Sequence, residues 1–259
     1  MRPLNEQIIL VTGASDGLGK RVAQELVARG ATVLVHGRHR QKTQAAAKEI
    51  GSEHVRIADL ASLDEVHRLA DEVDQLDTLV NNAGVIVPER KESADGYELT
   101  FAVNYLSHFL LTELLLPKLR EPGRIVNVSS LGQDALDFDD LMYERGYNAY
   151  FAYARSKLAQ VMFTMDLAER LRDREITVNA LHPATFMDTK MVTALGGQAR
   201  SSVEEGTQAV LRLVTDPDLD GVTGRFFDGT RESSVDGQAY DSEARRRLWD
   251  ASEELTRAA

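Results

Sequence analysis

Tyr153 and Lys157 are the side chains with the clearest chemical potential, because they stand four residues apart in Tyr-Ala-Arg-Ser-Lys. Side chains at i and i+4 share one helical face, so a phenol and an ammonium can address the same point in space. A phenol with a pKa of about 10 is a poor base near neutral pH. A unit positive charge about 4 Å away, at an effective dielectric constant of about 20, stabilises the ionised phenol by roughly 4 kcal/mol. This lowers the phenol pKa by about three units, before burial opposes the effect. The pair is suited to moving a proton, but Tyr-x-x-x-Lys alone is common and is more often a surface pair.

A glycine-rich segment near the N-terminus is the second such feature. The apolar run at 8–11 does not alternate with polar residues, as in a strand buried on both faces of a parallel sheet. Gly13, Gly17 and Gly19 follow it and open a helical pattern. Glycines let the backbone turn sharply and approach a ligand, and a helix that starts there points free N–H groups at that ligand. The segment predicts a phosphate-bearing ligand, although an ordinary tight strand-to-helix connection shows the same pattern.

Four motifs occur in the order typical of one known family. They are Thr12-Gly-Ala-Ser-Asp-Gly-Leu-Gly19, Asn81-Asn-Ala-Gly84, Ser129-Ser130 and Tyr153-Ala-Arg-Ser-Lys157. Together they resemble the short-chain dehydrogenase/reductase family, whose glycine motif is Thr-Gly-x-x-x-Gly-x-Gly. The resemblance covers nearly the whole chain. The segment between Ser130 and Tyr153, about ten residues longer than in many members, and the tail at 241–255 resemble the retinol-dehydrogenase-like branch.

The elements that position these motifs alternate between apolar runs and amphipathic helices. This alternation predicts an α/β fold in which residues 1–259 form a single doubly wound (Rossmann) domain, with a parallel sheet of about seven strands and helices on both faces. Two long helices are expected, at 97–119 and 149–171. Active residues of such sheets lie beyond the carboxyl ends of the strands, which is where Ser129-Ser130 falls.

The resemblance implies which residues form the site. The implied catalytic residues are Asn104, Ser130, Tyr153 and Lys157, although Asn104 could also be a satisfied buried amide. The implied cofactor-binding residues lie in the glycine turn, at strand ends and in the catalytic helix: Gly13, Ser15, Asp16, Gly17, Leu18, Gly19, Arg38, Asp59, Leu60, Asn82, Ala83, Gly84, Tyr153, Lys157, Pro183, Thr185 and Thr189. Many relatives have Pro-Gly at 183–184 and a run to Thr189 that is one residue shorter, so the contact of Thr189 with the nicotinamide amide is left open. His182 is interpreted as structural, and 187–201 as a segment that covers the substrate.

The end of the second predicted strand, 31–36, indicates the cofactor. An acidic side chain there would bind a ribose 2′-hydroxyl, whereas a cation suits a 2′-phosphate. This chain has Arg38, whose guanidinium can fork onto a phosphate. We therefore expect NADP(H) as the preferred cofactor and NAD(H) as a possible one, the alternative being that Arg38 is a solvated side chain in a basic loop.

Composition limits the partners. With 30 Lys and Arg against 41 Asp and Glu, the formal net charge is −11, which argues against nucleic acid or an anionic membrane surface. There is no cysteine, so no disulfide or thiolate metal site is expected, and no metal is assigned. The apolar stretch at 109–119 is too short and too polar to span a membrane, and a cytoplasmic protein is expected. A homodimer or homotetramer through the two long helices is a further expectation, which the longer segment before Tyr153 could block.

These observations favour an NADP(H)-dependent oxidoreductase that interconverts a ketone or aldehyde and an alcohol, with a small-molecule substrate and Tyr153 as general acid/base. One alternative is a catalytically silent dinucleotide-sensing or partner-binding protein on the same fold, which would be expected to lack one of the catalytic residues. Another is a nucleotide-sugar epimerase or dehydratase, but those have Thr-Gly-x-x-Gly-x-x-Gly and a larger C-terminal domain. The substrate, the reaction direction and the strictness of the cofactor preference stay open.

Overall fold

Strand β1 (Ile8–Val11) lies inside the sheet, paired in parallel with β2 (Thr32–Gly37) on one side and β4 (Leu76–Asn81) on the other. The computed structural model describes residues 1–188, 192 and 198–257. Its sheet has eight strands in the order β3-β2-β1-β4-β5-β6-β7-β8. The remaining strands are β3 (Val55–Ile57), β5 (Leu119–Val128), β6 (Ile176–His182), β7 (Phe226–Asp228) and β8 (Arg231–Glu232). Seven strands are parallel, which confirms the predicted sheet, and the two-residue β8 adds an antiparallel edge.

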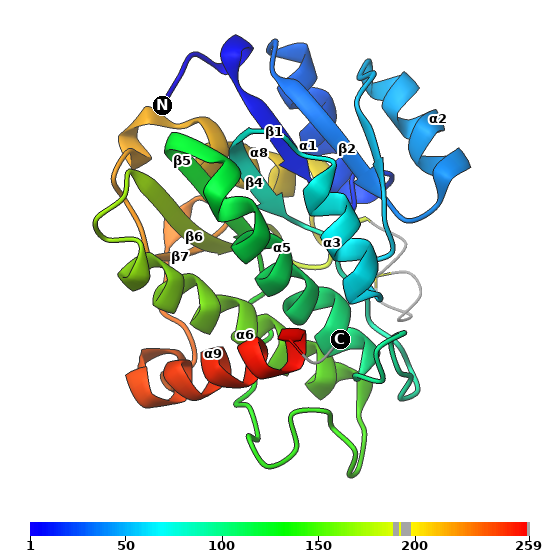
Figure 1. The fold of residues 1–259 in the computed structure, drawn as a ribbon, viewed down its shortest axis with the longest axis vertical. Helices are drawn as coiled ribbons and strands as arrows, with labels where there is room; N and C mark the ends of the chain where they lie inside the picture. The colour runs from blue at the N-terminus through cyan, green and yellow to red at the C-terminus, as the bar shows by residue number, and fades with distance from the viewer. Residues whose placement is uncertain (189–191, 193–197, 258–259) are drawn as a thin grey trace.

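Helices cover both faces of this sheet (Figure 1), and a buried apolar cluster lies between each face and its helices. One face carries α1 (Gly17–Ala28), α2 (Arg40–Ile50) and α8 (Val203–Thr215). The other carries α3 (Leu63–Asp71), α5 (Ser107–Leu115) and α6 (Ala149–Arg170). Short 3₁₀ turns occur at η1 (Leu4–Glu6), η4 (Pro217–Leu219) and η5 (Gly237–Tyr240). This is the doubly wound arrangement, and its ligand crevice lies at the carboxyl ends of the strands, where the strand order reverses beside β1.

The helix expected at 97–119 contains a local irregularity. It begins at Leu99 as α4 (Leu99–Phe101), widens into the π-helical segment η2 (Ala102–Leu106), continues as α5 and ends in the 3₁₀ turn η3 (Leu116–Lys118). Single π turns often mark functional sites, and this one contains Asn104. In the described part of the chain, this is the one helix long and apolar enough to cross a membrane, but 78% of its apolar window is buried inside the fold. It is therefore a core helix here.

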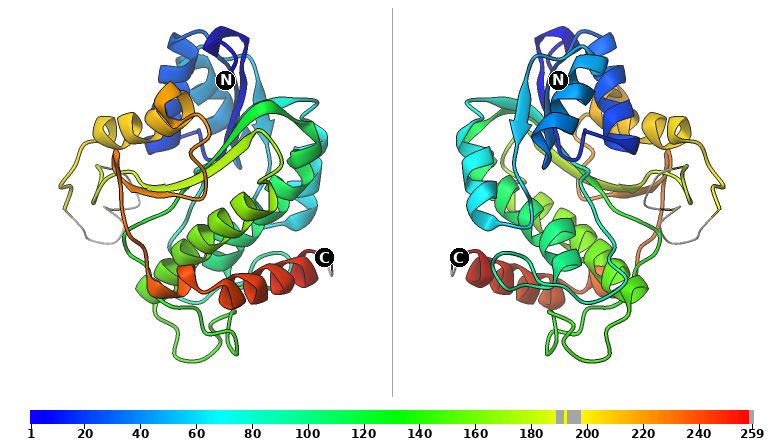
Figure 2. Two further views of the ribbon diagram at one scale, coloured as in Figure 1. Left: turned by 90° about the vertical axis from the view of Figure 1, so that its left-hand side faces the viewer. Right: turned by 90° about the vertical axis from the view of Figure 1, so that its right-hand side faces the viewer.

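The C-terminal helix α9 (Ser242–Arg257) lies on the outside of α6 in the ribbon views (Figure 1, Figure 2). Its Trp249 ring packs edge-on against Phe109 of α5, with centroids 5.0 Å apart, and stacks on Phe163 of α6 at 5.9 Å. The hydroxyl groups of Tyr105 and Ser252 are 2.6 Å apart beneath it. Apolar side chains of α5 and α6 that were expected to mediate association are thus packed against this helix of the same chain.

Candidate active site

The glycine turn packs tightly against the end of β4. A Cβ atom added to Gly19 would lie 2.6 Å from the carbonyl oxygen of Gly13 and closer still to the side-chain nitrogen of Asn82. A Cβ atom on Gly13, whose φ is +66°, would lie 2.9 Å from the α-carbon of Ala83. Both positions therefore require glycine because of contacts within the chain, before any ligand is considered.

Thr12 fixes the same junction through hydrogen bonds. Its hydroxyl oxygen accepts from the backbone N–H groups of Asn82 at 2.8 Å and Ala83 at 2.9 Å, and its carbonyl oxygen accepts from the Asn82 side chain at 2.7 Å. Thr12 is fully buried, so these bonds satisfy a polar group that water cannot reach. The predicted residues Gly13, Gly19, Asn82 and Ala83 are consequently one contiguous unit.

Asn104 holds the chain that follows Asn-Asn-Ala-Gly. Its side-chain oxygen accepts from the backbone N–H of Val85 at 2.7 Å, and its amide nitrogen donates to the Val85 carbonyl at 3.0 Å and to the Ser156 hydroxyl at 2.9 Å. Its side-chain oxygen would also lie 3.4 Å from a Cβ atom at Gly84. Asn104 thus links the π segment to α6 and to the loop after β4.

The two serines after β5 have different surroundings. The Ser129 hydroxyl is buried and donates to the carbonyl oxygen of Lys157 at 2.7 Å, which ties β5 to α6. The half-buried Ser130 hydroxyl accepts from the backbone N–H of Gly132 at 3.0 Å and forms a hydrogen bond with Tyr153. Only the second serine therefore faces the phenol.

Tyr153 and Lys157 lie on the same face of α6, with the Lys157 ammonium 5.5 Å from the centroid of the Tyr153 ring. Burial raises the pKa of Tyr153 above its ordinary value, and the hydrogen bond with Ser130 opposes this. The expected lowering of the phenol pKa is therefore not met in this state, because the effect of burial outweighs that of the hydrogen bond. Lys157 donates to the carbonyl oxygen of Val128 at 2.9 Å and to the side-chain oxygen of Gln160 at 2.8 Å, and burial lowers its pKa to about 7.

Sequence reasoning missed a buried histidine beside these residues. Nδ1 of His108 lies 3.1 Å from the carbonyl oxygen of Asn104 and 3.3 Å from the side-chain nitrogen of Gln160, while Nε2 lies 3.2 Å from the Thr12 hydroxyl. Burial lowers the pKa of His108 to about 3, with the Lys157 charge acting in the same direction, so the ring is neutral. Polar residues at helical spacing within two otherwise apolar helices were the signal that could have identified His108 and Gln160.

The candidates for the adenosine end of a dinucleotide surround β2. Arg38 is exposed, donates to the His39 ring at 3.2 Å and forms no ion pair with any residue that the structure describes. Asp16 caps α1 through Gly17 N–H at 2.9 Å and accepts from Lys42 at 2.9 Å. The Ser15 side chain would be 3.1 Å from a Cβ atom at Gly37, so the turn touches the end of β2.

Three other predicted cofactor-binding residues, Asp59, Leu60 and Leu18, are engaged by contacts within the chain. Asp59 accepts from the Ala61 N–H at 3.0 Å, and its own N–H donates to Glu65 at 2.7 Å. The side chains of Leu60 and Leu18 are buried in the two apolar clusters. Contacts of these two leucines with a ligand would have to use their backbone.

Beyond β6 the predicted residues separate. Pro183 is buried and lies close to Leu18 around Gly206 of α8, whereas Thr185 is exposed with its hydroxyl 3.0 Å from Nε2 of His182. This contact agrees with a structural role for His182. Thr189 and most of the segment expected to cover the substrate lie outside the described residues.

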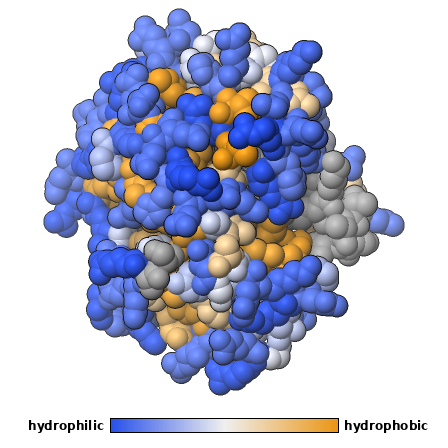
Figure 3. Space-filling model, turned by 45° about the vertical axis from the view of Figure 1, so that its right-hand side comes forward, coloured by the Kyte–Doolittle hydropathy of each residue, from blue (hydrophilic) through white to orange (hydrophobic). Residues whose placement is uncertain are grey.

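Exposed apolar side chains adjoin Ser130. Leu131, Tyr150 and Phe151 are 46%, 59% and 43% exposed, and the rings of Tyr150 and Phe151 are 5.5 Å apart. The Tyr150 hydroxyl and the Ser130 hydroxyl would both lie within 3.6 Å of a Cβ atom at Gly132. The face drawn in Figure 3 is mostly hydrophilic, with apolar patches between the hydrophilic residues. We call Leu131, Tyr150 and Phe151 the apolar rim.

The longer segment before Tyr153 is anchored beside this rim. The Tyr147 hydroxyl donates to the carbonyl oxygen of Val87 at 3.0 Å, Arg90 donates to that of Met142 at 3.2 Å, and the Arg155 guanidinium lies over the Tyr143 ring. These contacts join the segment to the loop after β4 and to α6. The segment therefore has a defined position next to the catalytic helix.

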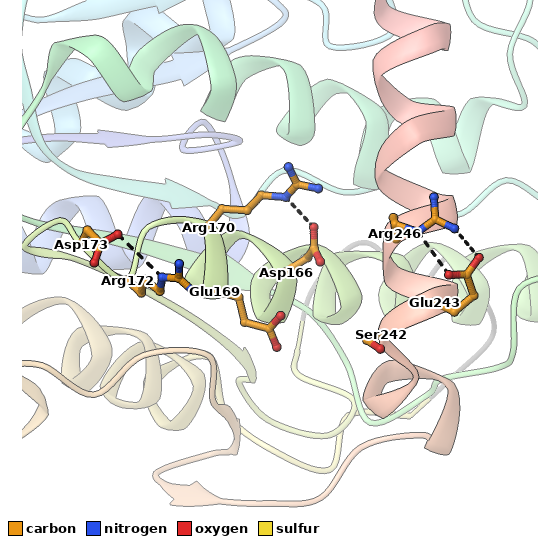
Figure 4. A pocket seen from close by; sticks show the side chains of 8 residues that line it. All are labelled: Asp166, Glu169, Arg170, Arg172, Asp173, Ser242, Glu243 and Arg246. Atoms are coloured by element: carbon orange, nitrogen blue, oxygen red, sulfur yellow. Dashed lines mark hydrogen bonds and ion pairs between the residues drawn. The ribbon is translucent and has the colours of Figure 1, made fainter.

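A charged hollow between α6 and α9 is separate from this site (Figure 4). Its arginines pair with neighbouring carboxylates, including Arg170 with Asp166 at 2.7 Å and Arg246 with Glu243 at 2.6 Å. Ion pairs near the surface contribute little to stability. Within residues 1–188, 192 and 198–257, no group of three or more His, Asp or Glu side chains is arranged to hold a metal ion.

Comparisons with known proteins agree with this geometry. Residues 7–199 match the family described as short chain dehydrogenase. Retinol dehydrogenase 13 of Homo sapiens is 40% identical over 276 aligned residues, which cover 95% of this chain and 83% of that protein. An uncharacterized protein from Mycobacterium paratuberculosis, known from its crystal structure, is 33% identical with a TM-score of 0.84 and coverage of 97% of this chain and 94% of that one. Pseudomonas aeruginosa RhlG, solved as an NADP active-site complex, is 28% identical with a TM-score of 0.72, covering 88% and 97%.

Proposed function

The chain belongs to the short-chain dehydrogenase family, in its retinol-dehydrogenase-like branch, and from this premise we propose that it uses NADP(H) to interconvert a ketone or aldehyde and an alcohol, with Tyr153 as general acid/base. Membership makes it an oxidoreductase acting on alcohol or carbonyl groups through a nicotinamide dinucleotide. The proposal adds the preferred cofactor, the proton-transfer residue and the kind of substrate.

One observation carries the catalytic part: Ser130, just after β5, is hydrogen-bonded to Tyr153, and the Lys157 ammonium lies 5.5 Å from the centroid of the Tyr153 ring. In this proposal Ser130 donates a hydrogen bond to the substrate oxygen and fixes its position. Tyr153 donates a proton to that oxygen in reduction and removes one in oxidation. Lys157 supplies the positive charge that favours the ionised phenol, from its position 5.5 Å from the centroid of the Tyr153 ring. Asn104 holds the loop and helix that frame them.

The residues present suit a nicotinamide dinucleotide. Bound there, the cofactor supplies or accepts the hydride. Gly84 has no side chain to fill the space beside Lys157, since a Cβ atom would lie 3.7 Å from Nζ. Arg38 supplies a cation at the end of β2 with no carboxylate paired to it in the described residues, which favours the 2′-phosphate of NADP(H) over NAD(H). The other predicted cofactor contacts, including Thr185 and Thr189, remain part of this proposal.

The apolar rim supports an apolar substrate. Three large apolar side chains that stay exposed beside a reactive serine are well placed to bury a hydrocarbon group of the substrate. Relatives at 36–40% identity are named retinol dehydrogenases, and retinol is an apolar alcohol. We propose apolar aldehydes and alcohols, retinoids among them, as the substrate class of a cytoplasmic enzyme. A homodimer or homotetramer would use surfaces other than those of α5 and α6 beneath α9.

A carbonyl and alcohol screen tests the proposal. Purified protein with NADPH or NADP⁺ is incubated with retinal, retinol, medium-chain aldehydes and alcohols and their short polar counterparts, and the absorbance at the nicotinamide band is followed. The proposal predicts turnover that is faster with NADPH than with NADH and faster with apolar than with short polar carbonyls. Tight NADPH binding without turnover of any compound would favour the silent dinucleotide-binding alternative.

A further inference from the structure

Lys157 is a buried cation with no counter-ion among the residues that the structure describes. Only 4% of its side chain is exposed, and the two acceptors of its ammonium, the Val128 carbonyl and the Gln160 side chain, are both neutral. Burial is the sole cause of its lowered pKa in the described part of the chain, so no carboxylate compensates its charge. The two neutral oxygens therefore decide where this ammonium stays and how readily it keeps its proton.

Gln160 is itself held in place. It follows Lys157 by three residues on α6, is 1% exposed, and its backbone carbonyl accepts from the Thr164 hydroxyl at 2.8 Å. Its side-chain nitrogen lies 3.3 Å from Nδ1 of His108, on the opposite side from Lys157. With the amide so placed, the oxygen points at the ammonium and the nitrogen at the imidazole.

The His108 ring completes a chain of polar contacts to the glycine turn. The Thr12 hydroxyl lies 3.2 Å from Nε2 of His108 and donates to the Val80 carbonyl at 3.3 Å, and Nδ1 of His108 lies 3.1 Å from the Asn104 carbonyl. The ring thus contacts Thr12, which follows β1, Asn104 of the π segment and Gln160 of α6. The ring borders the Gln160 side chain, and of these two residues Gln160 is the one that contacts the Lys157 ammonium.

We propose that Gln160 is a positioning residue for the reaction proposed above: its side-chain oxygen holds the Lys157 ammonium in the charged form and at the depth from which it promotes ionisation of Tyr153. The inference rests on the proposed function, because it needs Tyr153 to be the proton-transfer group. Gln160 acts through Lys157 and touches neither substrate nor cofactor in this assignment.

The surrounding charges make the effect measurable. The titratable groups facing Lys157 and Gln160 are Tyr153 on their own helix and His108 on α5, and Tyr150 acts on Tyr153 from one turn away. His108 stays neutral because its pKa is about 3. A carboxylate at 160 would therefore be the first negative charge beside Lys157 within the described residues, and it would cancel the ammonium charge that Tyr153 experiences.

The test compares Gln160→Glu, Gln160→Met and Thr164→Val with the wild type, using the best substrate from the screen. The pH profile of kcat/KM for alcohol oxidation, which needs ionised Tyr153, is recorded for each. For Gln160→Glu we expect the acidic limb to move up by about one pH unit. For Gln160→Met, which keeps the length of the side chain but removes the acceptor, we expect the limb to move in the same direction and kcat to fall at least tenfold.

Thr164→Val is the matched control, since Thr164 is as deeply buried on α6 as Gln160. The Thr164 hydroxyl donates to the backbone carbonyl of Gln160 rather than to the Gln160 side chain. The melting temperature of this variant should fall while the limb stays in place. An unshifted acidic limb of the pH profile in both Gln160 variants would overturn the inference. An equal shift of that limb in Thr164→Val would overturn it as well. If Gln160→Glu does not fold, the result for Gln160→Met decides. The same unshifted limbs together with a Tyr153→Phe protein that retains turnover would instead refute the proposed function.

Discussion

Gly19 packs directly against the side chain of Asn82, so the start of α1 and the end of β4 touch with no room for another carbon atom. The carbonyl oxygen of Gly13 closes the same space from the other side. The glycine motif and Asn-Asn-Ala-Gly, about 65 residues apart in the chain, are thus two halves of one structure. The glycines at these positions are therefore needed for packing within the fold as well as for the approach of a ligand.

Replacing Gly19 by Ala should therefore separate α1 from β4. We expect a loss of about 1–3 kcal/mol in the free energy of unfolding and a fall of at least tenfold in NADPH affinity, because the methyl group overfills a packed junction. Chemical denaturation and fluorescence titration measure the two quantities. Gly237→Ala is the control, since a Cβ atom there meets nothing within 4 Å, and an equally large loss in that variant would refute the steric explanation.

Arg38→Ala should reduce NADPH affinity and leave NADH affinity nearly unchanged. The loss of a charged hydrogen bond to the 2′-phosphate corresponds to roughly 1.5–3 kcal/mol. Titration of both cofactors against both proteins is the measurement, with the exposed Arg68 of α3 replaced by Ala as the control. Equal affinity of the unmodified protein for NADPH and NADH would contradict the assignment of Arg38.

Folding stability should fall as the pH drops from about 6.5 to about 4, in part through His36. Its Nδ1 accepts from the Gly13 N–H at 3.2 Å and its Nε2–H donates to the Ala58 carbonyl at 3.0 Å, so the folded protein needs the neutral ring. Burial lowers the pKa of His36 to about 4. The unfolded chain takes up the proton first, near pH 6.5, so the folded state loses on the order of 3 kcal/mol by pH 4.

The variant His36→Gln isolates this contribution. It should be less stable than the wild type at pH 7 but lose less stability between pH 6.5 and 4, as measured by urea unfolding at each pH. His67→Gln, at an exposed position of α3, should keep the wild-type slope. An unchanged slope in His36→Gln would show that other groups cause the acid sensitivity.

Trp249→Ala should detach α9 from α5 and α6. The indole is 5% exposed and packs on Phe109, Phe163 and the Arg170 guanidinium, and truncation of such a ring costs about 3–5 kcal/mol. Arg257→Ala, on the exposed side of the same helix, should change stability by less than about 0.5 kcal/mol. Light scattering of the tryptophan variant should reveal self-association through the uncovered faces, and a strictly monomeric, fully stable variant would contradict this role of α9.

Much of the fold was predictable because its signals are local. The apolar run at 8–11, the glycines after it and Asn81-Asn-Ala-Gly84 each identify an element end, and the order of the motifs then identifies the sheet. The long helix predicted at 97–119 is present from Leu99 to Lys118, but its widening into a π turn at Ala102–Leu106 was not predicted. Asn104 in that turn bonds the backbone of Val85, 19 residues away in sequence, and a helical pattern does not reveal such a contact.

The site was predictable in its residue types but not in its resting geometry. Spacing indicated that Lys157 shares a face with Tyr153, yet it could not show that the ammonium is bound by Val128 and Gln160. The balance that raises the pKa of Tyr153 depends on burial, which is set by the whole fold. The packing of α9 over α5 and α6 is likewise a tertiary property, so apolar positions on those helices suggested an interface between subunits.

The most direct test of the proposed function is turnover by Tyr153→Phe, with NADPH affinity measured on the same preparation. The substitution removes one hydroxyl group, keeps the ring and leaves Ser130 and Lys157 in place. We predict that kcat falls by about 10² to 10⁴ while the Kd for NADPH stays within a few fold. A Tyr153→Phe protein that retains near-normal turnover would contradict the assignment of Tyr153 as the general acid/base.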